Sequence, residues 1–154
     1  MMPPDSVPAR GALQDGRHFF PIRVYFEDTD FTGIVYHANY LRFIERARTE
    51  MLRELGFHQA AIHASDKGDA LFFVVARMQI EFLRPARMDD LLSVETRPLK
   101  ISAAVIELEQ IVRRDNESLF TARVLIAALA DGKPRRLPRE IREKLALGQA
   151  CVGS

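Results

Sequence analysis

Three carboxylates, Glu27, Asp28 and Asp30, lie within four consecutive positions of the chain. Like charges this close disfavour each other's ionised forms, so stability alone does not account for them. Gly33 follows, and a glycine permits a positive φ or a close approach of the backbone. Because a helical pattern begins near Tyr40, the carboxylates should lie beside the N–H groups of a helix N-terminus. A carboxylate next to such donors suits chemistry on a carbonyl group.

A long helix between residues 40 and 55 should position this corner. Its apolar residues recur at helical spacing. They are Tyr40, Phe43, Ile44, Ala47, Met51, Leu52 and Leu55. Charged residues fill most of the other face, and pairs such as Arg46 with Glu50 add only about 0.2–0.5 kcal/mol each. Burial of the apolar face must therefore hold the helix in place, and Gly56 is a suitable stop.

The remaining pattern predicts strands, recognised by alternating or continuous runs of apolar residues. The expected strands span residues 19–27, 72–84, 91–98, 103–113 and 119–129. Pro21 suggests an edge position for the first strand, and the continuously apolar last strand should be an inner one. Short turns favour antiparallel neighbours. We therefore expect an α+β fold in which a five-stranded antiparallel sheet wraps around one long helix.

Composition excludes several classes of protein. The chain has 154 residues, of which 47% are hydrophobic and 28% charged, which is ordinary for one globular domain. A formal net charge of +1 gives no general attraction to nucleic acid or to an anionic membrane. No apolar run of transmembrane length is present, and the start lacks a signal-peptide pattern. With the single cysteine, Cys151, these features predict a cytoplasmic protein.

The chain divides into three parts by composition. Residues 1–17 hold three prolines and two glycines without periodicity, and we expect a disordered lead there. Residues 18–147 should form one domain that ends in a short helix opened by Pro138. Residues 148–154 are expected to be a tail.

Four segments of the sequence closely resemble the 4-hydroxybenzoyl-CoA thioesterase family. They are EDTDFTGIVYHANY at 27–40, FIERARTEML at 43–52, FVVARM at 73–78 and RPARMDDL at 84–91. Within the family, the match is most similar to the acyl-CoA thioesterases encoded beside the Tol–Pal system. The resemblance covers roughly residues 21–138 and implies the hot-dog fold. It is specific because the matching positions fall in the predicted strand–turn–helix context.

The resemblance implies roles for particular residues. Asp30 would be the catalytic carboxylate, and the backbone N–H of His37 would polarise the thioester carbonyl. Gly33 would be the turn glycine that lets the chain approach the substrate. The other substrate-binding candidates near the helix start are Tyr36, Ala38 and Tyr40. The family also implies a sheet that continues across a homodimer, or a tetramer built from it, with active sites at the interface.

The chemistry of these residues leaves alternatives open. Asp30 could activate water as a general base or attack the thioester carbon directly, and its alternative role is a turn or cap residue. The His37 side chain could bind the thioester oxygen or protonate the leaving thiolate, or it could bond to backbone. Tyr36 and Tyr40 line the acyl pocket in one interpretation and belong to the core in the other.

Coenzyme A carries phosphates, so its site needs local cations. Two groups are candidates: Arg84 with Arg87, and Arg135 with Arg136 beside Lys133. No cofactor is expected apart from coenzyme A as part of the substrate. His18, His58 and His63 lack the spacing of a metal site. The resemblance also implies acyl carrier protein as a partner.

Two rival functions come from other classes. Residues 28–32 fit the Asp-x-Asp-x-Thr pattern of Mg²⁺-dependent haloacid-dehalogenase-like phosphatases, but that chemistry requires a doubly wound parallel sheet. The second rival is a hot-dog module that binds acyl-CoA or acyl carrier protein without turnover. Release of free thiol by the wild type and not by Asp30→Asn distinguishes an enzyme from such a module.

Overall fold

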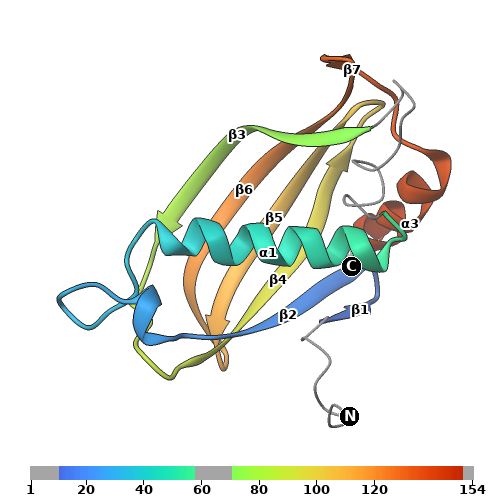
Figure 1. Ribbon diagram of the computed structural model, residues 1–154. Helices are drawn as coiled ribbons and strands as arrows, with labels where there is room; N and C mark the ends of the chain where they lie inside the picture. The colour runs from blue at the N-terminus through green and yellow to red at the C-terminus, as the bar shows by residue number, and fades with distance from the viewer. Residues whose placement is uncertain (1–10, 58–70, 151–154) are drawn as a thin grey trace, which may run out of the picture.

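The computed structural model describes residues 11–57 and 71–150. In these ranges a seven-stranded sheet wraps around one long helix (Figure 1). The strands are β1 Ala12–Gln14, β2 Arg17–Arg23, β3 Phe72–Phe82, β4 Leu91–Ile101, β5 Val105–Arg114, β6 Glu117–Ala130 and β7 Lys133–Pro134. The helices are η1 Phe26–Asp28, α1 Asn39–Glu54 and α3 Arg139–Ala150. None of the helices in the described ranges has the length and apolar character needed to cross a bilayer.

The strand order is β1-β2-β4-β5-β6-β3, with β7 paired to β6, and every pair is antiparallel. This confirms the α+β prediction of an antiparallel sheet around a helix. The sheet has seven strands and not the five expected, because the short strands β1 and β7 were not predicted. The strand order also confirms β6 as an inner strand, because β6 lies between β5 and β3. A doubly wound parallel sheet is absent from the described residues, which removes the structural basis of the phosphatase rival.

Because short turns favour antiparallel neighbours, the strands now labelled β3 and β4 were expected to pair with each other, and this prediction is wrong. β3 pairs with β6, whereas β4 lies between β2 and β5. The connection over residues 83–90 is longer than a tight turn, so it can carry the chain across the end of the sheet. It is held there by contacts with the loop before α1, where Ile34 bridges Arg87 and the Val35 N–H donates to Ala86 O at 2.8 Å.

The terminal boundaries also differ from the expectation. Predicted disorder is wrong for residues 12–17, because β1 and β2 form a hairpin through Asp15 and Gly16, which have φ values of 53° and 77°. An Asp-Gly pair tolerates this conformation, which is why a hairpin can form in so short a segment. α3 continues to Ala150, beyond the predicted end. The rest of the two expected tails, and residues 58–70, lie outside the described residues. The edge position that Pro21 suggested is correct only locally. β2 lies between β1 and β4, but β1 pairs only with residues 17–19, so Pro21 has no strand partner on that side among the described residues.

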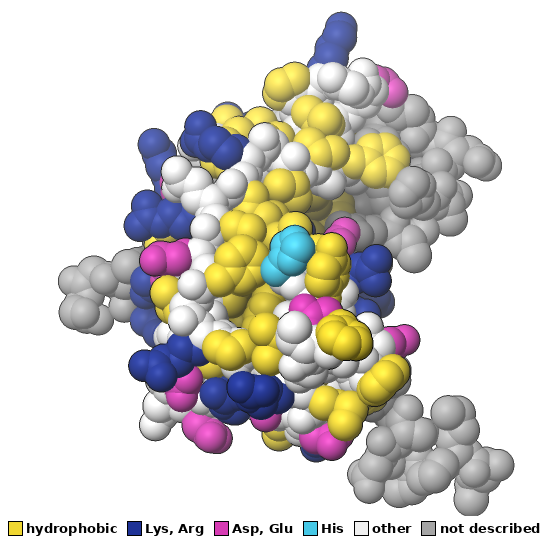
Figure 2. Space-filling model, turned by 90° about the vertical axis from the view of Figure 1, so that its left-hand side faces the viewer, with side chains coloured by type: hydrophobic (Ala, Val, Ile, Leu, Met, Phe, Trp, Pro, Cys, Tyr) yellow, Lys and Arg dark blue, Asp and Glu magenta, His cyan; other side chains and the backbone are white. Residues whose placement is uncertain are grey.

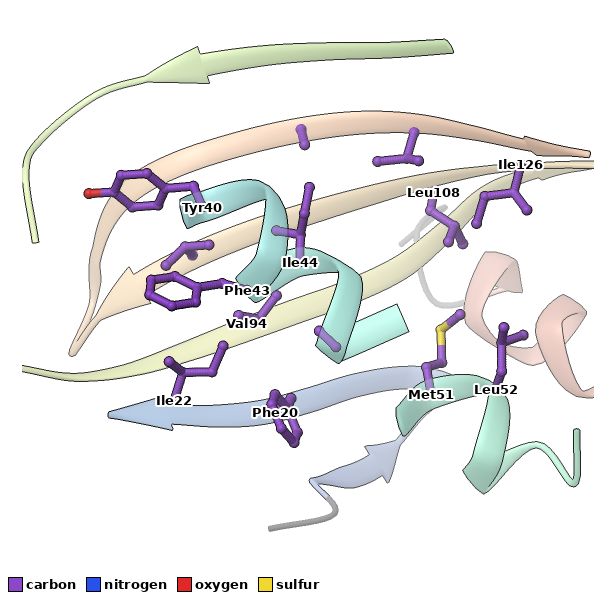
Figure 3. Packing of buried hydrophobic residues seen from close by; sticks show 14 of the residues in the cluster. Phe20, Ile22, Tyr40, Phe43, Ile44, Met51, Leu52, Val94, Leu108 and Ile126 are labelled. Atoms are coloured by element: carbon purple, nitrogen blue, oxygen red, sulfur yellow. The ribbon is translucent and has the colours of Figure 1, made fainter. Parts of the chain in front are cut away.

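The core lies between α1 and the concave face of the sheet (Figure 3). All seven residues of the predicted apolar stripe are at most 5% exposed. Burying a large apolar side chain contributes about 1.5–3 kcal/mol, far more than a surface ion pair. At the end of α1, Gly56 has a φ of 90° and Lys144 Nζ donates to Leu55 O at 3.3 Å. Packing against the sheet and the contact at the C-terminal end of α1 together fix the direction in which its N-terminus points.

Candidate active site

The segment before α1 forms a closed loop (residues 28–38), which we call the catalytic loop because it holds the predicted catalytic carboxylate, Asp30. Thr29 bridges Val35, and the Asp30 N–H donates to Ile34 O at 2.9 Å. The Gly33 N–H returns to Asp30 O at 3.0 Å, and Gly33 has a φ of 83°. A side chain at Gly33 would meet no atom within 4 Å, so the backbone conformation is what requires glycine.

Asp28 anchors the loop to α1. Its Oδ2 accepts the Tyr25 N–H at 2.8 Å, and its Oδ1 accepts Asn39 Nδ2 at 2.7 Å. Its backbone oxygen accepts the Tyr36 N–H at 2.9 Å. Asp28 is only 5% exposed, so it is a structural carboxylate. Asn39 was not predicted, although an amide side chain at the first helical position was a usable signal.

Of the two aspartates, Asp30 is the one whose carboxylate remains available. Its Oδ1 accepts both the N–H and the hydroxyl of Thr32, at 2.8 and 2.5 Å. These two bonds, with a smaller contribution from the charge of His37, hold the pKa of Asp30 below its ordinary value, although partial burial opposes them. Within residues 11–57 and 71–150, Oδ2 has no hydrogen-bond partner. Asp30 is therefore ionised at neutral pH and presents one free oxygen.

His37 and Ala38 lie where the loop enters α1. The Asn39 N–H donates to Tyr36 O at 2.8 Å, but the N–H groups of His37 and Ala38 donate to no residue that the structure describes. The first turn of α1 holds no acidic residue and no side chain caps it. These donors and the helix dipole are thus available to a developing negative charge.

The aromatic candidates separate into an exposed and a buried one. Tyr36 is 47% exposed, and its ring lies 4.5 Å from that of His37, which also meets the Phe82 ring edge-on at 6.3 Å. Tyr40 is 3% exposed and stacks on Phe120 at 5.0 Å. Its hydroxyl accepts the N–H of Ala86 at 3.0 Å, and burial raises its pKa. Tyr40 therefore belongs to the core, and its contact with substrate stays a prediction.

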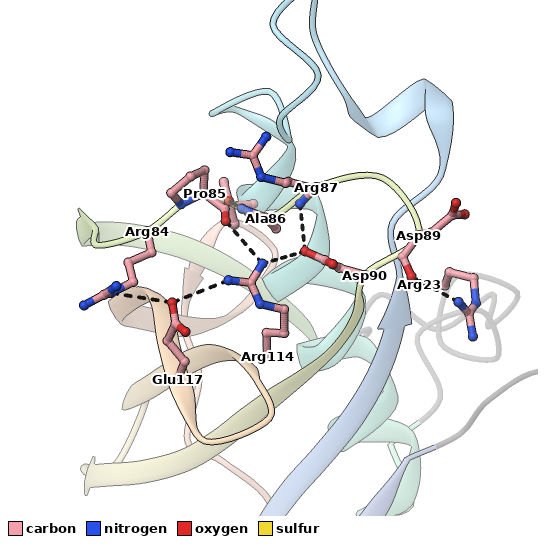
Figure 4. A network of polar contacts seen from close by, with 10 residues as sticks. Arg23, Arg84, Pro85, Ala86, Arg87, Asp89, Asp90, Arg114 and Glu117 are labelled. Atoms are coloured by element: carbon pink, nitrogen blue, oxygen red, sulfur yellow. Dashed lines mark hydrogen bonds and ion pairs between the residues drawn. The ribbon is translucent and has the colours of Figure 1, made fainter.

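A polar network ties the 83–90 connection to the adjoining ends of β5 and β6 (Figure 4). Arg114 pairs with Asp90 at 2.7 Å and with Glu117 at 3.4 Å. Asp90 also accepts the N–H of Arg87 at 2.8 Å, and Arg84 pairs with Glu117 at 3.5 Å. Arg114 could not be recognised from the sequence, because its partners become its neighbours only when the strands have paired.

The two candidate cation groups lie at opposite ends of the sheet. Arg84 and Arg87 are exposed beside the catalytic loop. Arg135 and Arg136 follow β7, whose partner in β6 is at Leu129. Strands rise about 3.3 Å per residue, so roughly 30 Å separates this end of β6 from the end that faces Phe82. Within one chain, only Arg84 and Arg87 share an end of the sheet with Asp30. No group of three or more potential metal ligands occurs among the described residues.

Three comparisons agree on the kind of protein that has this arrangement. The Thioesterase superfamily matches residues 32–121. The chain is 42% identical over 125 residues to the acyl-CoA thioester hydrolase YbgC of Escherichia coli, covering 79% of this chain and 90% of the relative. It is 43% identical over 132 residues to the acyl-CoA thioesterase YbgC of Haemophilus influenzae, covering 84% of this chain and 95% of that protein. The crystal structure of a probable thioesterase from Bartonella henselae superposes with a TM-score of 0.75 at 47% identity, covering 79% of this chain and 99% of the other.

Proposed function

The chain belongs to the thioesterase superfamily, has the hot-dog fold and hydrolyses acyl-CoA thioesters, and we propose that Asp30 is its catalytic carboxylate. One observation carries the proposal. Asp30 keeps an ionised carboxylate with a free Oδ2 in a loop that Asp28 and Asn39 tie to the N-terminus of α1. The N–H groups of His37 and Ala38 are the proposed donors to the thioester oxygen.

Two routes are open to Oδ2 of Asp30. It can remove a proton from a water molecule that attacks the thioester carbon, or it can attack that carbon itself and form a mixed anhydride that water then opens. Both routes place negative charge on the thioester oxygen and then expel the coenzyme A thiolate. We propose that the exposed His37 imidazole supplies the proton that this thiolate takes up. Single-turnover hydrolysis in ¹⁸O-water tests for direct attack. Water that opens the anhydride at the Asp30 carboxyl carbon leaves ¹⁸O on Asp30, whereas the general-base route leaves Asp30 unlabelled.

We further propose that the enzyme is a homodimer, or a tetramer built from it, joined through β3. In the described part of the chain, β3 pairs only with β6, so its other edge is open. Exposed apolar side chains run along it: Val74, Val75, Ile80 and Phe82 are 40–49% exposed. The face that carries the catalytic loop also displays many hydrophobic side chains (Figure 2). A long apolar edge strand normally acquires a partner, and a second β3 related by a two-fold axis fits this one.

This dimer would bring the two cation groups together. Antiparallel pairing of two β3 strands sets the Phe82 end of one subunit beside the Phe72 end of the other. Arg84 and Arg87 would then approach Arg135 and Arg136 of the partner subunit. We propose that both groups bind the phosphates of coenzyme A. If so, Arg87→Gln and Arg135→Gln raise KM for acyl-CoA more than for the acyl-dephospho-CoA that lacks the 3′-phosphate.

The physiological setting is also a proposal. A cytoplasmic location is supported by the use of a single cysteine, and a link to the Tol–Pal system by the sequence resemblance alone. No metal or other cofactor is proposed, so a chelator should leave the activity unchanged. Acyl carrier protein is proposed as an alternative carrier of the acyl group, and acyl-CoA and acyl carrier protein thioesters should be compared directly.

The deciding experiment is release of free thiol from a panel of acyl-CoAs by the wild type and by Asp30→Asn. The substitution removes the charge with little change in shape, so the variant should fold and lose most of its kcat. Binding of acyl-CoA without turnover by the wild type would instead support a non-catalytic module. Undiminished hydrolysis by a folded Asp30→Asn protein would remove Asp30 from the mechanism.

A further inference from the structure

A pocket of about 210 Å³ lies between α1 and the first half of β3. Glu45, Arg48 and Thr49 of α1 form its polar side, while Leu52, Phe73 and Ile126 give it an apolar wall. It is smaller than the roughly 300–1,000 Å³ pockets that hold drug-sized ligands, so its volume suits a short acyl group.

Arg48 is an unusual residue for such a wall, because it is only 8% exposed. Its Nη1 donates to Gln110 Oε1 at 2.9 Å, and Gln110 Nε2 in turn donates to Ile44 O and to Thr96 Oγ1, both at 2.9 Å. The guanidinium is thus held by a neutral partner that is itself fixed. Among the ion pairs of the described residues, none includes Arg48.

The charge of Arg48 is therefore incompletely compensated. Burial lowers its pKa, and among the described residues Glu45 is the only carboxylate that opposes this effect. Glu45 is exposed, so water screens its charge more strongly than that of the buried guanidinium. A buried cation without a paired anion is costly, and an anionic ligand group would relieve the cost.

The pocket cannot serve the catalytic loop of its own chain with a short acyl group. Thr49 lies ten residues into α1, about 15 Å along the helix from Asn39. In the dimer proposed above, the Phe82 end of the second subunit lies beside Phe73 of the first. Since His37 contacts Phe82, the catalytic loop of the second subunit comes with it.

We propose that this pocket receives the acyl group of a thioester held by the partner subunit's catalytic loop, and that Arg48 selects acyl groups ending in a carboxylate. The substrate class is thus the coenzyme A monothioesters of short dicarboxylic acids. The distal carboxylate would accept hydrogen bonds from Arg48 and Thr49, while its methylene groups contact Leu52 and Ile126. This inference rests on the proposed function and on the dimer joined through β3.

The first test compares glutaryl-CoA with valeryl-CoA, which have the same number of acyl carbons and differ in the terminal group. The wild type should prefer glutaryl-CoA by at least about tenfold in kcat/KM, because a charge-assisted hydrogen bond is otherwise lost. Arg48→Gln and the milder Thr49→Val should each lower that ratio. Arg46→Gln, an exposed arginine on the same helix, is the matched control and should leave the ratio unchanged.

The outcomes separate this inference from the proposed function. Hydrolysis of valeryl-CoA without a preference for glutaryl-CoA overturns the inference and leaves the thioesterase assignment intact. An equal loss on both substrates in a folded Thr49→Val protein also overturns it, because selectivity would then not depend on the pocket. Failure to hydrolyse any acyl-CoA in the panel would overturn the proposed function itself.

The second test asks whether pocket and carboxylate belong to different subunits. An Asp30→Asn chain is co-expressed with a Thr49→Trp chain, whose pocket is blocked, and the heterodimer is purified through two affinity tags. If the site is shared, Asp30 of the blocked chain uses the open pocket of its partner, and about half the activity of a wild-type dimer returns. An intact heterodimer that is as inactive as the two parents overturns the shared site.

Discussion

The side-chain amide of Asn39 donates to the carboxylate of Asp28 at 2.7 Å, and both residues are at most 8% exposed. This contact joins the first turn of α1 to the start of the catalytic loop. It therefore determines how Asp30, which touches neither residue through its side chain, is placed relative to the helix N-terminus. Asp28 thus fixes the geometry of the loop, and Asp30 remains free for chemistry.

Asn39→Ala should weaken both stability and catalysis. It leaves the buried Asp28 carboxylate without one of its donors, which costs about 1–3 kcal/mol of unfolding free energy. Because the loop loses its fixed position, kcat should fall about tenfold or more while KM changes little. Urea unfolding and steady-state thiol release measure the two effects. Asn116→Ala, an exposed asparagine in the β5–β6 turn, serves as control, and unchanged kcat in Asn39→Ala would contradict the positioning role.

Thr32→Val should shift the acid limb of the pH–rate profile. The two bonds from Thr32 hold the pKa of Asp30 below 3.8, so the carboxylate stays ionised, and activity is retained, to a more acidic pH than usual. Activity that needs the ionised form is present above this pKa and is lost as the pH falls through it. Removing the hydroxyl raises the pKa of Asp30, so the limb should move to higher pH. The profile of kcat/KM against pH tests this shift, and Thr121→Val is the control. An acid limb of Thr32→Val that coincides with that of the wild type would contradict the prediction.

The elements that local periodicity determines were predictable from the sequence. The apolar face of α1 follows from a 3.6-residue repeat, and that repeat already included Tyr40. Its assignment to the core rather than to the substrate pocket was thus available from the same pattern. Gly33 was likewise readable, because a turn that needs a positive φ selects glycine at one position.

Features that depend on which strands pair were not predictable. The periodicity of β3 is the same whether its neighbour is β4 or β6, since alternation records a buried face and not a partner. Arg114 and Asp90 are separated by 24 residues and meet only after β4 and β5 have paired. Asp28 and Asp30 have the same chemistry, so the local pattern does not tell them apart. The resemblance singled out Asp30, and the contacts of Asp28 with Tyr25 and Asn39 explain why Asp28 is the buried one.

Asp90→Asn should loosen the connection that supports the catalytic loop. Asp90 accepts hydrogen bonds from both Arg114 and the Arg87 N–H, so the loss of its charge weakens two contacts at once. Because the ion pair is partly exposed, the stability loss should be at most about 1 kcal/mol and should shrink at high salt. The main effect should be a higher KM for acyl-CoA, since Arg87 is a proposed phosphate ligand. Asp15→Asn, in the exposed β1–β2 turn at the opposite edge of the sheet from β3, is the control, and equal KM values in the two variants would argue against this support.

Ile80→Lys should convert the proposed dimer to a monomer. Ile80 is 40% exposed on the open edge of β3, and a lysine there would bury charge against a second β3 or prevent the approach. Light scattering after size exclusion should show half the wild-type mass, while circular dichroism shows that the chain remains folded. Activity should fall together with the dimer, because the substrate pocket of each site would come from the other subunit. Gln79→Lys adds the same charge at the neighbouring polar position and should retain the dimer. A monomeric Ile80→Lys protein with full activity would show that one chain contains the whole active site.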